Sequence, residues 1–378
     1  MPGKRLNKAK RIVVKLGSNV ITASNSLNLE VIDSISRQIC TLNDKGIEVI
    51  LVSSGAMAAG LKKMKMDGRP DAIPKRQAIS AIGQSGLMNA YEKSFGVFGK
   101  KIAQILLTSE DLNDRKRYLN VRNALYTLID WGVVPVVNEN DTIMIEEIKL
   151  GDNDNLAAMI TLLLDADFLF ILTDIDGLFN KDPRVFEDAK LISSVTTFKE
   201  EIDTYASDIP GTLGTGGMLS KVEAAKKVTS AGIPMIVAKG DTNNVLLRLF
   251  QGEKLGTYFV PKNEKMTSRK CWIAHTITPK GCITIDNGAA LAVSKNCKSL
   301  LPIGVVDVHG TFGEGAAVNF QTIEKEILGT GLVNYRSSDI NLIKGLKTYQ
   351  IESCLGGKHY DEIIHRDNLV LTNRHVAD

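Results

Sequence analysis

Six short, continuous apolar runs constrain the fold of this chain more than any other feature of its sequence. The runs lie at 11–16, 47–53, 102–108, 133–138, 168–173 and 233–238. Apolar runs that do not alternate with polar residues are typical of strands buried on both faces of a parallel sheet. Helix-like stretches separate them, at about 28–45, 75–95, 114–131, 154–165 and 219–231. This order predicts an α/β sandwich with a mainly parallel central sheet.

The sequence changes character near residue 261. The stretch VPKNEKMTSRK is polar and charged, which is typical of a linker. Short β-like runs punctuated by glycine follow it, in GCITIDNGAALAV, SLLPIGVVDVHGTFGEGAAVNF and NLVLTN. We therefore predict a first domain over 1–260, a linker over 261–270, and a small mainly-β domain with a C-terminal tail over 271–378.

Composition excludes several classes of protein. A net charge of +3 over 378 residues gives no reason to expect a chain dominated by nucleic-acid or membrane contacts. The five cysteines are scattered without a C-x-x-C pair, which argues against a disulfide framework or a zinc site. The longest apolar region, MITLLLDADFLFIL, is interrupted by Asp165 and Asp167 and is not expected to span a membrane. We expect a cytoplasmic protein.

Polar residues lie at the carboxyl ends of four of the apolar runs or directly after those ends. They are Lys15, Gly17 and Ser18; Ser53, Ser54 and Gly55; Asn138 and Asp141; and Thr173 and Asp174. In open α/β sheets ligands bind outside the carboxyl ends of the strands, where these four sets would meet. Lys15 stands inside an apolar run, and burying its charge would require an anionic partner. The segment SSGA opens a predicted helix, whose free amides can bind an anion.

Two segments are rich in asparagine and aspartate. They are NENDT, which contains Asn138 and Asp141, and GDNDNLAA, which contains Asn153 and Asp154. The second segment leads into a predicted helix, and a helix N-cap would account for one of these residues but not for all of them. Clustered amides and carboxylates suit recognition of the amino group and carboxylate of a small polar substrate.

A glycine-rich segment, GTLGTGGMLSK at 211–221, precedes another predicted helix. It matches neither the G-x-x-x-x-G-K pattern of nucleoside triphosphatases nor the G-x-G-x-x-G dinucleotide pattern. Glycines let backbone amides approach an anion, and the helix start would add its partial positive charge near Lys221. The alternative is a flexible loop with a solvated lysine.

The histidines all lie late in the chain, from His275 onward, so no serine–histidine–aspartate set is evident. A carboxylate that attacks a donor phosphate needs no general base, because it is already ionised at neutral pH. Catalysis would then consist of positioning and of charge neutralisation by lysines, amides and a metal ion. Two lysines and a glycine-rich loop meet that requirement.

Six motifs together resemble the amino-acid kinase superfamily and, within it, the glutamate 5-kinase family. They are VVKLGSNVIT, LVSSGAMAAG, VVNENDT, GDNDNLAAMI, LTDIDGLFNKDPR and GTGGMLSKVEAA, in the order that the family shows. The C-terminal third resembles a PUA domain. The resemblance covers nearly the whole chain and implies an amino-acid kinase sandwich followed by a PUA domain. The implied activity is ATP-dependent phosphorylation of the side-chain carboxylate of L-glutamate, the first step of proline biosynthesis.

The resemblance also assigns roles to residues. It implies that Lys15 contacts the transferred phosphoryl group from the acceptor side, that Lys221 neutralises the donor phosphates, and that Asp154 holds both lysines. Glutamate would be bound by Ser54, Asn138, Asp141 and Asn153. ATP would be bound by Lys15, Thr173, Asp174, Thr215, Gly216, Gly217, Met218, Leu219, Ser220 and Lys221. Magnesium would be held mainly by the ATP phosphates, without dedicated protein ligands.

Further partners follow from the same resemblance, which implies feedback inhibition by proline and a homo-oligomer, either a dimer or a tetramer. PUA domains often bind RNA, but 13 Lys and Arg against 12 Asp and Glu over 263–378 are a poor electrostatic footprint for it. Two other enzymes stay open as alternatives. DIDG fits a haloacid-dehalogenase-like phosphatase, and the kinase motifs also fit a sister kinase that acts on another carboxylate or phosphate.

Overall fold

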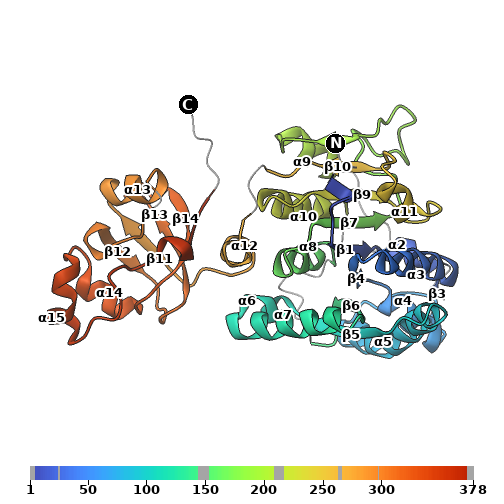
Figure 1. Cartoon of the computed structure of the whole chain (residues 1–378), viewed down its shortest axis with the longest axis horizontal. Helices are drawn as coiled ribbons and strands as arrows, with labels where there is room; N and C mark the ends of the chain where they lie inside the picture. The colour runs from blue at the N-terminus through green and yellow to red at the C-terminus, as the bar shows by residue number, and fades with distance from the viewer. Residues whose placement is uncertain are drawn as a thin grey trace. The chain divides into compact units, whose positions relative to one another are not determined.

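The computed structural model describes residues 5–23, 26–143, 153–207, 217–262, 266–296 and 298–372. The chain forms two compact units, Met1–Lys265 and Met266–Asp378 (Figure 1). Within the described residues, no helix is both long enough and apolar enough to cross a membrane.

An eight-stranded, mainly parallel sheet forms the centre of the first unit. In spatial order it contains β5 (Ile102–Leu107), β6 (Val134–Glu139), β4 (Glu48–Ser53), β1 (Arg11–Leu16), β7 (Phe168–Thr173), β9 (Met235–Lys239), β10 (Thr257–Phe259) and β8 (Ser194–Val195). Every neighbouring pair is parallel except β9 with β10. All six predicted strands are present, with ends within two residues of the expected ones, so the predicted fold class is confirmed.

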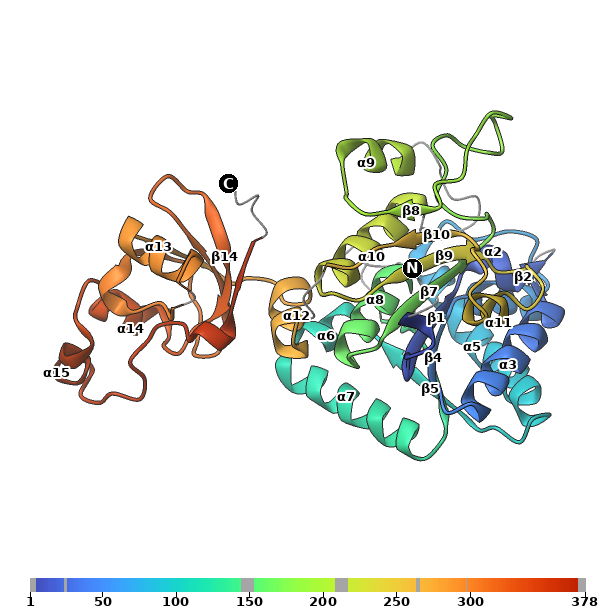
Figure 2. The same cartoon turned by 45° about the horizontal axis from the view of Figure 1, so that its top comes forward.

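Helices cover both faces of this sheet (Figures 1 and 2). One face carries α3 (Leu29–Asp44), α5 (Ile73–Gly96) and α11 (Val245–Phe250), and the other carries α7 (Arg115–Asp130), α8 (Asn153–Leu163) and α10 (Met218–Ser230). The remaining elements are α2 (Ser18–Ile21), the β2 (Thr22–Ala23) and β3 (Ser26–Leu27) pair, α4 (Ala56–Met64), α6 (Ser109–Asn113) and α9 (Glu200–Ser207). Because both faces are covered, β1 and β7 are buried almost throughout, as their apolar runs predicted.

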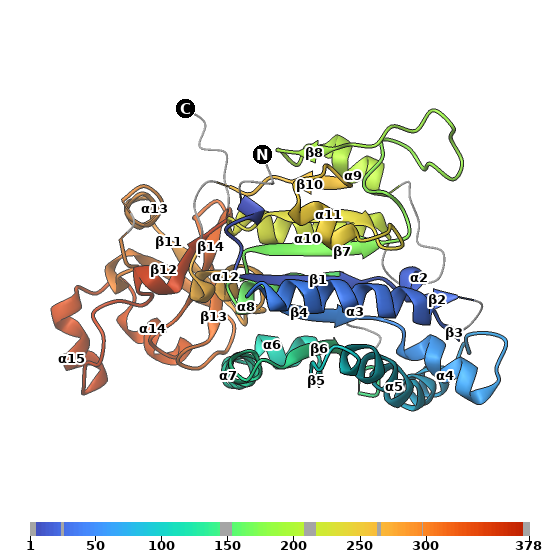
Figure 3. The same ribbon diagram turned by 45° about the vertical axis from the view of Figure 1, so that its right-hand side comes forward.

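Helices α4 and α5 cross with their backbones in direct contact. A Cβ atom on Gly83 would lie 1.8 Å from the carbonyl oxygen of Ala56, and one on Gly60 would lie 2.0 Å from that of Ile79. No side chain can be added at either glycine without moving a helix. This crossing fixes α5 against α4, the helix that follows β4 (Figure 3).

A five-stranded sheet forms the second unit. In spatial order it contains β12 (Val305–His309), β11 (Cys282–Ile285), β13 (Ala317–Gln321), β14 (Ile327–Leu332) and β15 (Leu369–Leu371), with only β11 and β13 parallel. The helices are α12 (Ser268–His275), α13 (Asn287–Ser294), α14 (Ser337–Ile343) and α15 (Ile351–Leu355), with 3₁₀ turns η1 (Pro302–Gly304), η2 (Thr348–Gln350) and η3 (Arg366–Asn368). The predicted small mainly-β domain is thus confirmed.

Two stretches of the second unit differ from the sequence analysis. GCITIDNGAALAV is a strand only over Cys282–Ile285, and its second half forms α13 because the Asp286 carboxylate accepts a hydrogen bond from the amide of Ala289 at 2.7 Å. Helix α12 begins at Ser268, inside the stretch read as a linker, where the side chain of Thr267 caps it.

Candidate active site

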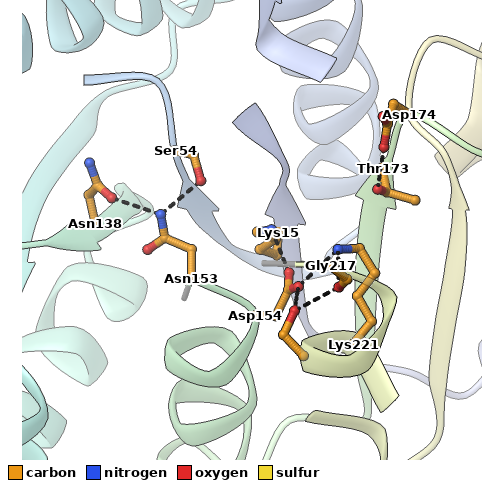
Figure 4. Close-up of polar contacts among 10 residues, drawn as sticks. Lys15, Ser54, Asn138, Asn153, Asp154, Thr173, Asp174, Gly217 and Lys221 are labelled. Carbon is orange, nitrogen blue, oxygen red and sulfur yellow. Dashed lines mark hydrogen bonds and ion pairs between the residues drawn. The ribbon is translucent and has the colours of Figure 1, made fainter. Parts of the chain in front are cut away.

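Residues from four neighbouring strands meet at the carboxyl edge of the first sheet (Figure 4). Lys15 lies near the end of β1, and Ser54 directly follows β4. Asn138 lies near the end of β6, and Thr173 ends β7. Helices α8 and α10 begin at the same edge and bring Asp154 and Lys221 to it.

The Asp154 carboxylate lies between two lysines. Its Oδ2 atom is 3.0 Å from Nζ of Lys221, and its Oδ1 atom forms an ion pair with Nζ of Lys15. All three residues are buried, with 0% of Asp154 and 5% of each lysine exposed. We call Lys15, Asp154 and Lys221 the Lys–Asp–Lys cluster. The anionic partner expected for Lys15 is therefore Asp154, from a distant part of the chain.

The charges of this cluster favour an anionic ligand. Burial alone would raise the pKa of Asp154, but the positive charges of Lys15 and Lys221 outweigh it and hold that pKa well below its ordinary value. With Asp154 ionised and both lysines protonated, the three residues carry a net charge of +1. A buried excess charge is expensive unless something compensates it, so the cluster is built to receive a negatively charged group.

The start of α10 adds donors beside this cluster. Ser220 Oγ lies 2.8 Å from Asp154 Oδ2 and 2.9 Å from the Gly217 carbonyl oxygen, either of which can accept its single hydrogen, and Nζ of Lys221 lies 3.3 Å from the same carbonyl. Gly217 has no side chain and caps the helix without a side-chain hydrogen bond. The first amides of α10 therefore face the site with the partial positive charge of a helix N-terminus.

The remaining residues predicted to bind ATP in the glycine-rich segment at 211–221 differ in exposure, and some of them are not described. Met218 is buried, whereas Leu219 is 44% exposed. Thr215 and Gly216, with the rest of the glycine-rich segment up to 216, lie outside the described residues.

An amide network lies next to the cluster on the β4 and β6 side. Nδ2 of Asn153 donates to Ser54 Oγ at 2.8 Å and to Asn138 Oδ1 at 3.1 Å, and the backbone amide of Glu139 also donates to Asn138 Oδ1. The Oδ1 atom of Asn153 is buried and accepts no hydrogen bond within the described chain. Asn153 and Asp154 are consecutive at the start of α8, so one helix turn holds the network beside the cluster.

Asp141 lies in the turn that follows β6. Burial raises the pKa of its carboxyl group, although a hydrogen bond from Ser80 and the positive charge of Arg69 act in the opposite direction. A partly desolvated carboxylate gains from an additional cationic partner, such as a substrate ammonium group. Asp141 therefore suits the role that the resemblance implied for it.

Thr173 and Asp174 lie on the opposite side of the cluster (Figure 4). Thr173 Oγ1 donates to Asp174 Oδ1 at 3.0 Å, and Nδ2 of Asn19 donates to Asp174 Oδ2 at 2.8 Å. Although burial acts to raise the pKa of Asp174, these hydrogen bonds and the charge of Lys221 lower it. Asn19 was not singled out from the sequence, although its position two residues after Gly17 offered a signal.

Comparisons with known proteins identify the families that the two units resemble. Residues 10–239 match the amino acid kinase family, and residues 281–355 match the PUA domain. The chain is 49% identical over 365 residues to a glutamate 5-kinase of Caldanaerobacter subterraneus subsp. tengcongensis, covering 96% of this chain and 98% of that protein. It is 48% identical over 367 residues to a glutamate 5-kinase of Geobacter sulfurreducens, covering 97% and 98%.

Similar solved structures include a carbamate kinase from Giardia lamblia bound to AMP-PNP. The sequence identity is 18% and the TM-score is 0.49, with 68% of this chain and all of that chain covered.

Proposed function

The chain belongs to the amino acid kinase family, and from that premise we propose that it transfers the γ-phosphoryl group of ATP to the side-chain carboxylate of L-glutamate. The products are ADP and L-glutamyl 5-phosphate. The chain is 49% and 48% identical, over nearly its full length, to two proteins named glutamate 5-kinase. This similarity supports glutamate as the substrate. The observation that carries the proposal is the buried Lys–Asp–Lys cluster, whose net charge of +1 lies between an amide network and a helix start.

The reaction needs no proton transfer. A side-chain carboxylate oxygen of glutamate, ionised at neutral pH, forms the new bond to the γ-phosphorus while the bond to the β–γ bridging oxygen breaks and ADP leaves. Lys15 would contact the transferred group from the acceptor side, and Lys221 would neutralise the charge that develops on the donor side. Asp154 would hold both ammonium groups in place, so that no reorganisation is needed in the transition state.

The amide network is suited to bind the amino-acid end of the substrate. Oδ1 of Asn153, which accepts no hydrogen bond within the described residues, and the carboxylate of Asp141 would accept hydrogen bonds from the α-ammonium group. Ser54 and Asn138 accept hydrogen bonds from Nδ2 of Asn153 and so fix the orientation of its side-chain amide. We assign these four residues to the glutamate site.

On the donor side, we assign the ATP phosphates to the start of α10 and to Lys221. Thr173 and Asp174 would flank the nucleotide at the end of β7. Within the parts of the chain that are described, no three or more His, Cys, Asp or Glu side chains are grouped closely enough to hold a metal ion. On the family resemblance we propose a Mg²⁺ ion bound chiefly through the oxygens of ATP, where it would neutralise phosphate charge.

Glutamyl phosphate formation tests the proposal directly. With ATP and hydroxylamine present, we expect a hydroxamate from glutamate and at most a trace from aspartate or N-acetylglutamate. Preference for either of the other acceptors would contradict the glutamate assignment and indicate a sister kinase. Phosphatase activity without ATP, abolished in Asp174→Asn, would instead support the haloacid-dehalogenase-like alternative.

Inhibition by proline can be measured in the same hydroxamate assay. Proline carries the same α-carboxylate and a cationic amine, so we propose that it competes with glutamate at or near the amide network. We further propose, on the family resemblance alone, that the chain forms a homo-oligomer, either a dimer or a tetramer.

We also propose that the PUA domain binds RNA, on the match of residues 281–355 to that domain. An open pocket of about 720 Å³ in the second unit is a candidate contact surface. Lys298, His365 and Arg366 line it, but so do Asp286 and Glu362, so binding should be weak and sensitive to salt. We expect single-stranded RNA to be retained in filter binding at low salt and released at physiological salt. Arg366→Ala should weaken retention, and absence of retention by the wild type at low salt would remove the proposal.

A further inference from the structure

Helix α5 presents one buried face to both segments that we assign to the glutamate site. Ser80, Gly83, Leu87 and Tyr91 are buried and are spaced by three, four and four residues, which places them on one side of the helix. The sequence predicts this helix, but none of its residues carries a motif that points to the reaction. The two ends of this face touch different segments.

At one end, Tyr91 supports the turn that carries Ser54. The hydroxyl oxygen of Tyr91 lies 2.7 Å from Oγ of Ser53, which itself donates to the carbonyl oxygen of Ser54 at 3.0 Å. A serine hydroxyl has one hydrogen atom, so Tyr91 is the donor in its contact with Ser53. Both Tyr91 and Ser53 are 0% exposed, so these bonds are shielded from bulk solvent. A relay of two hydrogen bonds thus runs from α5 to the backbone of Ser54.

The turn at Ser54 and Gly55 has an unusual backbone conformation, so it needs the support of this relay. Gly55 has φ of +104°, and a Cβ atom there would lie 2.6 Å from the Ile21 side chain. Ser54 is otherwise tied to the sheet by a backbone hydrogen bond to Leu16 at 3.3 Å, which is long. The relay therefore supplies a second constraint on the residue whose hydroxyl accepts from Asn153.

At the other end of the face, Ser80 lies close enough to Asp141 to act as a hydrogen-bond partner that lowers the pKa of its carboxyl group. Ser80 is 2% exposed. Between the two ends, Gly83 lies against the backbone of α4, so that α5 cannot slide along α4 without a clash. The distance between the two supported segments is therefore set by a rigid pair of helices.

We infer that α5 sets the geometry of the amino-acid end of the acceptor site, with Tyr91 and Ser80 as positioning residues for Ser54 and Asp141. This inference rests on the proposed function, because it takes both segments to bind glutamate. Neither side chain is assigned a contact with the substrate. Their loss should loosen the site and weaken ground-state and transition-state binding alike.

Steady-state kinetics of Tyr91→Phe and Ser80→Ala test the inference. Tyr91→Phe removes a neutral hydrogen bond and Ser80→Ala removes a hydrogen-bond partner of a carboxylate. We therefore expect the KM for glutamate to rise about three- to tenfold in Tyr91→Phe and at least as much in Ser80→Ala, with kcat and the KM for ATP within about twofold of wild type. Adding Ser53→Ala to Tyr91→Phe should raise the KM little beyond Ser53→Ala alone, because both substitutions break the same relay.

Two control variants separate positioning from general loss of stability. Tyr126→Phe removes a tyrosine hydroxyl that bonds to Arg11 and to the Leu164 carbonyl at the opposite end of the sheet. Ser94→Ala removes a serine hydroxyl of α5 itself that bonds to Asp33 and to the Ala90 carbonyl. Both controls should lower the melting temperature and leave the KM for glutamate unchanged.

The possible outcomes are distinct. If Tyr91→Phe and Ser80→Ala behave like the controls, or raise the KM for ATP equally, the inference is wrong. Should one variant fail to fold, the other carries the test alone. If the wild type forms no glutamyl hydroxamate, the proposed function itself fails, and that result is visible before any variant is measured.

Discussion

Replacing Asp154 by asparagine should nearly abolish phosphoryl transfer and also destabilise the fold. Asparagine keeps the size of the side chain and a possible hydrogen bond with Ser220, but it removes the only charge that compensates Lys15 and Lys221 within the cluster. The cluster would then carry a charge of +2 in a buried site. Both lysines lose the group that orients them, so we expect kcat to fall on the order of a thousandfold.

Stability should fall in the same variant, because removal of one partner from a buried ion pair leaves uncompensated charge. A loss of about 3 kcal/mol in the free energy of unfolding is expected, measured by urea denaturation. Asp167→Asn is the matched control. Asp167 accepts hydrogen bonds from the backbone amides of Lys10 and Arg11 at the other end of β1. The control should lose some stability and keep its kcat, whereas an Asp154→Asn enzyme with normal kcat would contradict the assigned role.

The pH dependence of stability should report the same carboxylate. The pKa of Asp154 is lower in the folded chain than in the unfolded chain, so its contribution to stability is fully present above the ordinary value of 3.8. That contribution is lost only as the pH falls from this value through the folded pKa. The difference in stability between wild type and Asp154→Asn should therefore be constant near neutral pH and shrink in strong acid.

The first unit shows why most of the fold could be predicted from the sequence. Continuous apolar runs between helical stretches specify strands buried on both faces, and β1 and β7 begin and end at the predicted residues. Strands β8 and β10 contain two and three residues, too few to form a pattern. The run that became α13 is apolar and short, and periodicity alone does not separate a helix from a strand at that length. The capping residue Asp286 was the available signal.

The candidate site could be predicted in part, for a physical reason. A lysine inside a buried strand requires an anionic partner, so Lys15 could be singled out without any structure. Its partner Asp154 lies on another element, and spacing along the chain carries no information about which carboxylate folds onto which lysine. Tyr91 and Ser80 were missed because a tyrosine and a serine inside a helix resemble ordinary packing residues. Their significance lies in the segments that they touch.

Replacing Lys221 by methionine should separate activity from stability, in contrast to the asparagine variant of Asp154. Methionine fills the space of the buried aliphatic stem and removes only the charge, so the net charge of the cluster falls from +1 to zero. The free energy of unfolding should then change little or rise, because the remaining pair of Lys15 and Asp154 is balanced.

Activity of the Lys221→Met enzyme should nevertheless fall sharply, because the charge that it lacks is the one facing the donor phosphates. Loss of one oriented charge at a transition state lowers kcat by about a hundredfold or more, and we expect the KM for ATP to rise with it. Lys15→Met is the matched comparison, since it makes the same change of charge from the acceptor side. It should lower kcat to a similar extent while raising the KM for glutamate rather than for ATP. Identical kinetic profiles in the two variants would show that the lysines do not divide the donor and acceptor sides between them. Unchanged turnover in either variant would remove its assigned role, even though the Lys–Asp–Lys cluster would still stand as a buried structural ion pair.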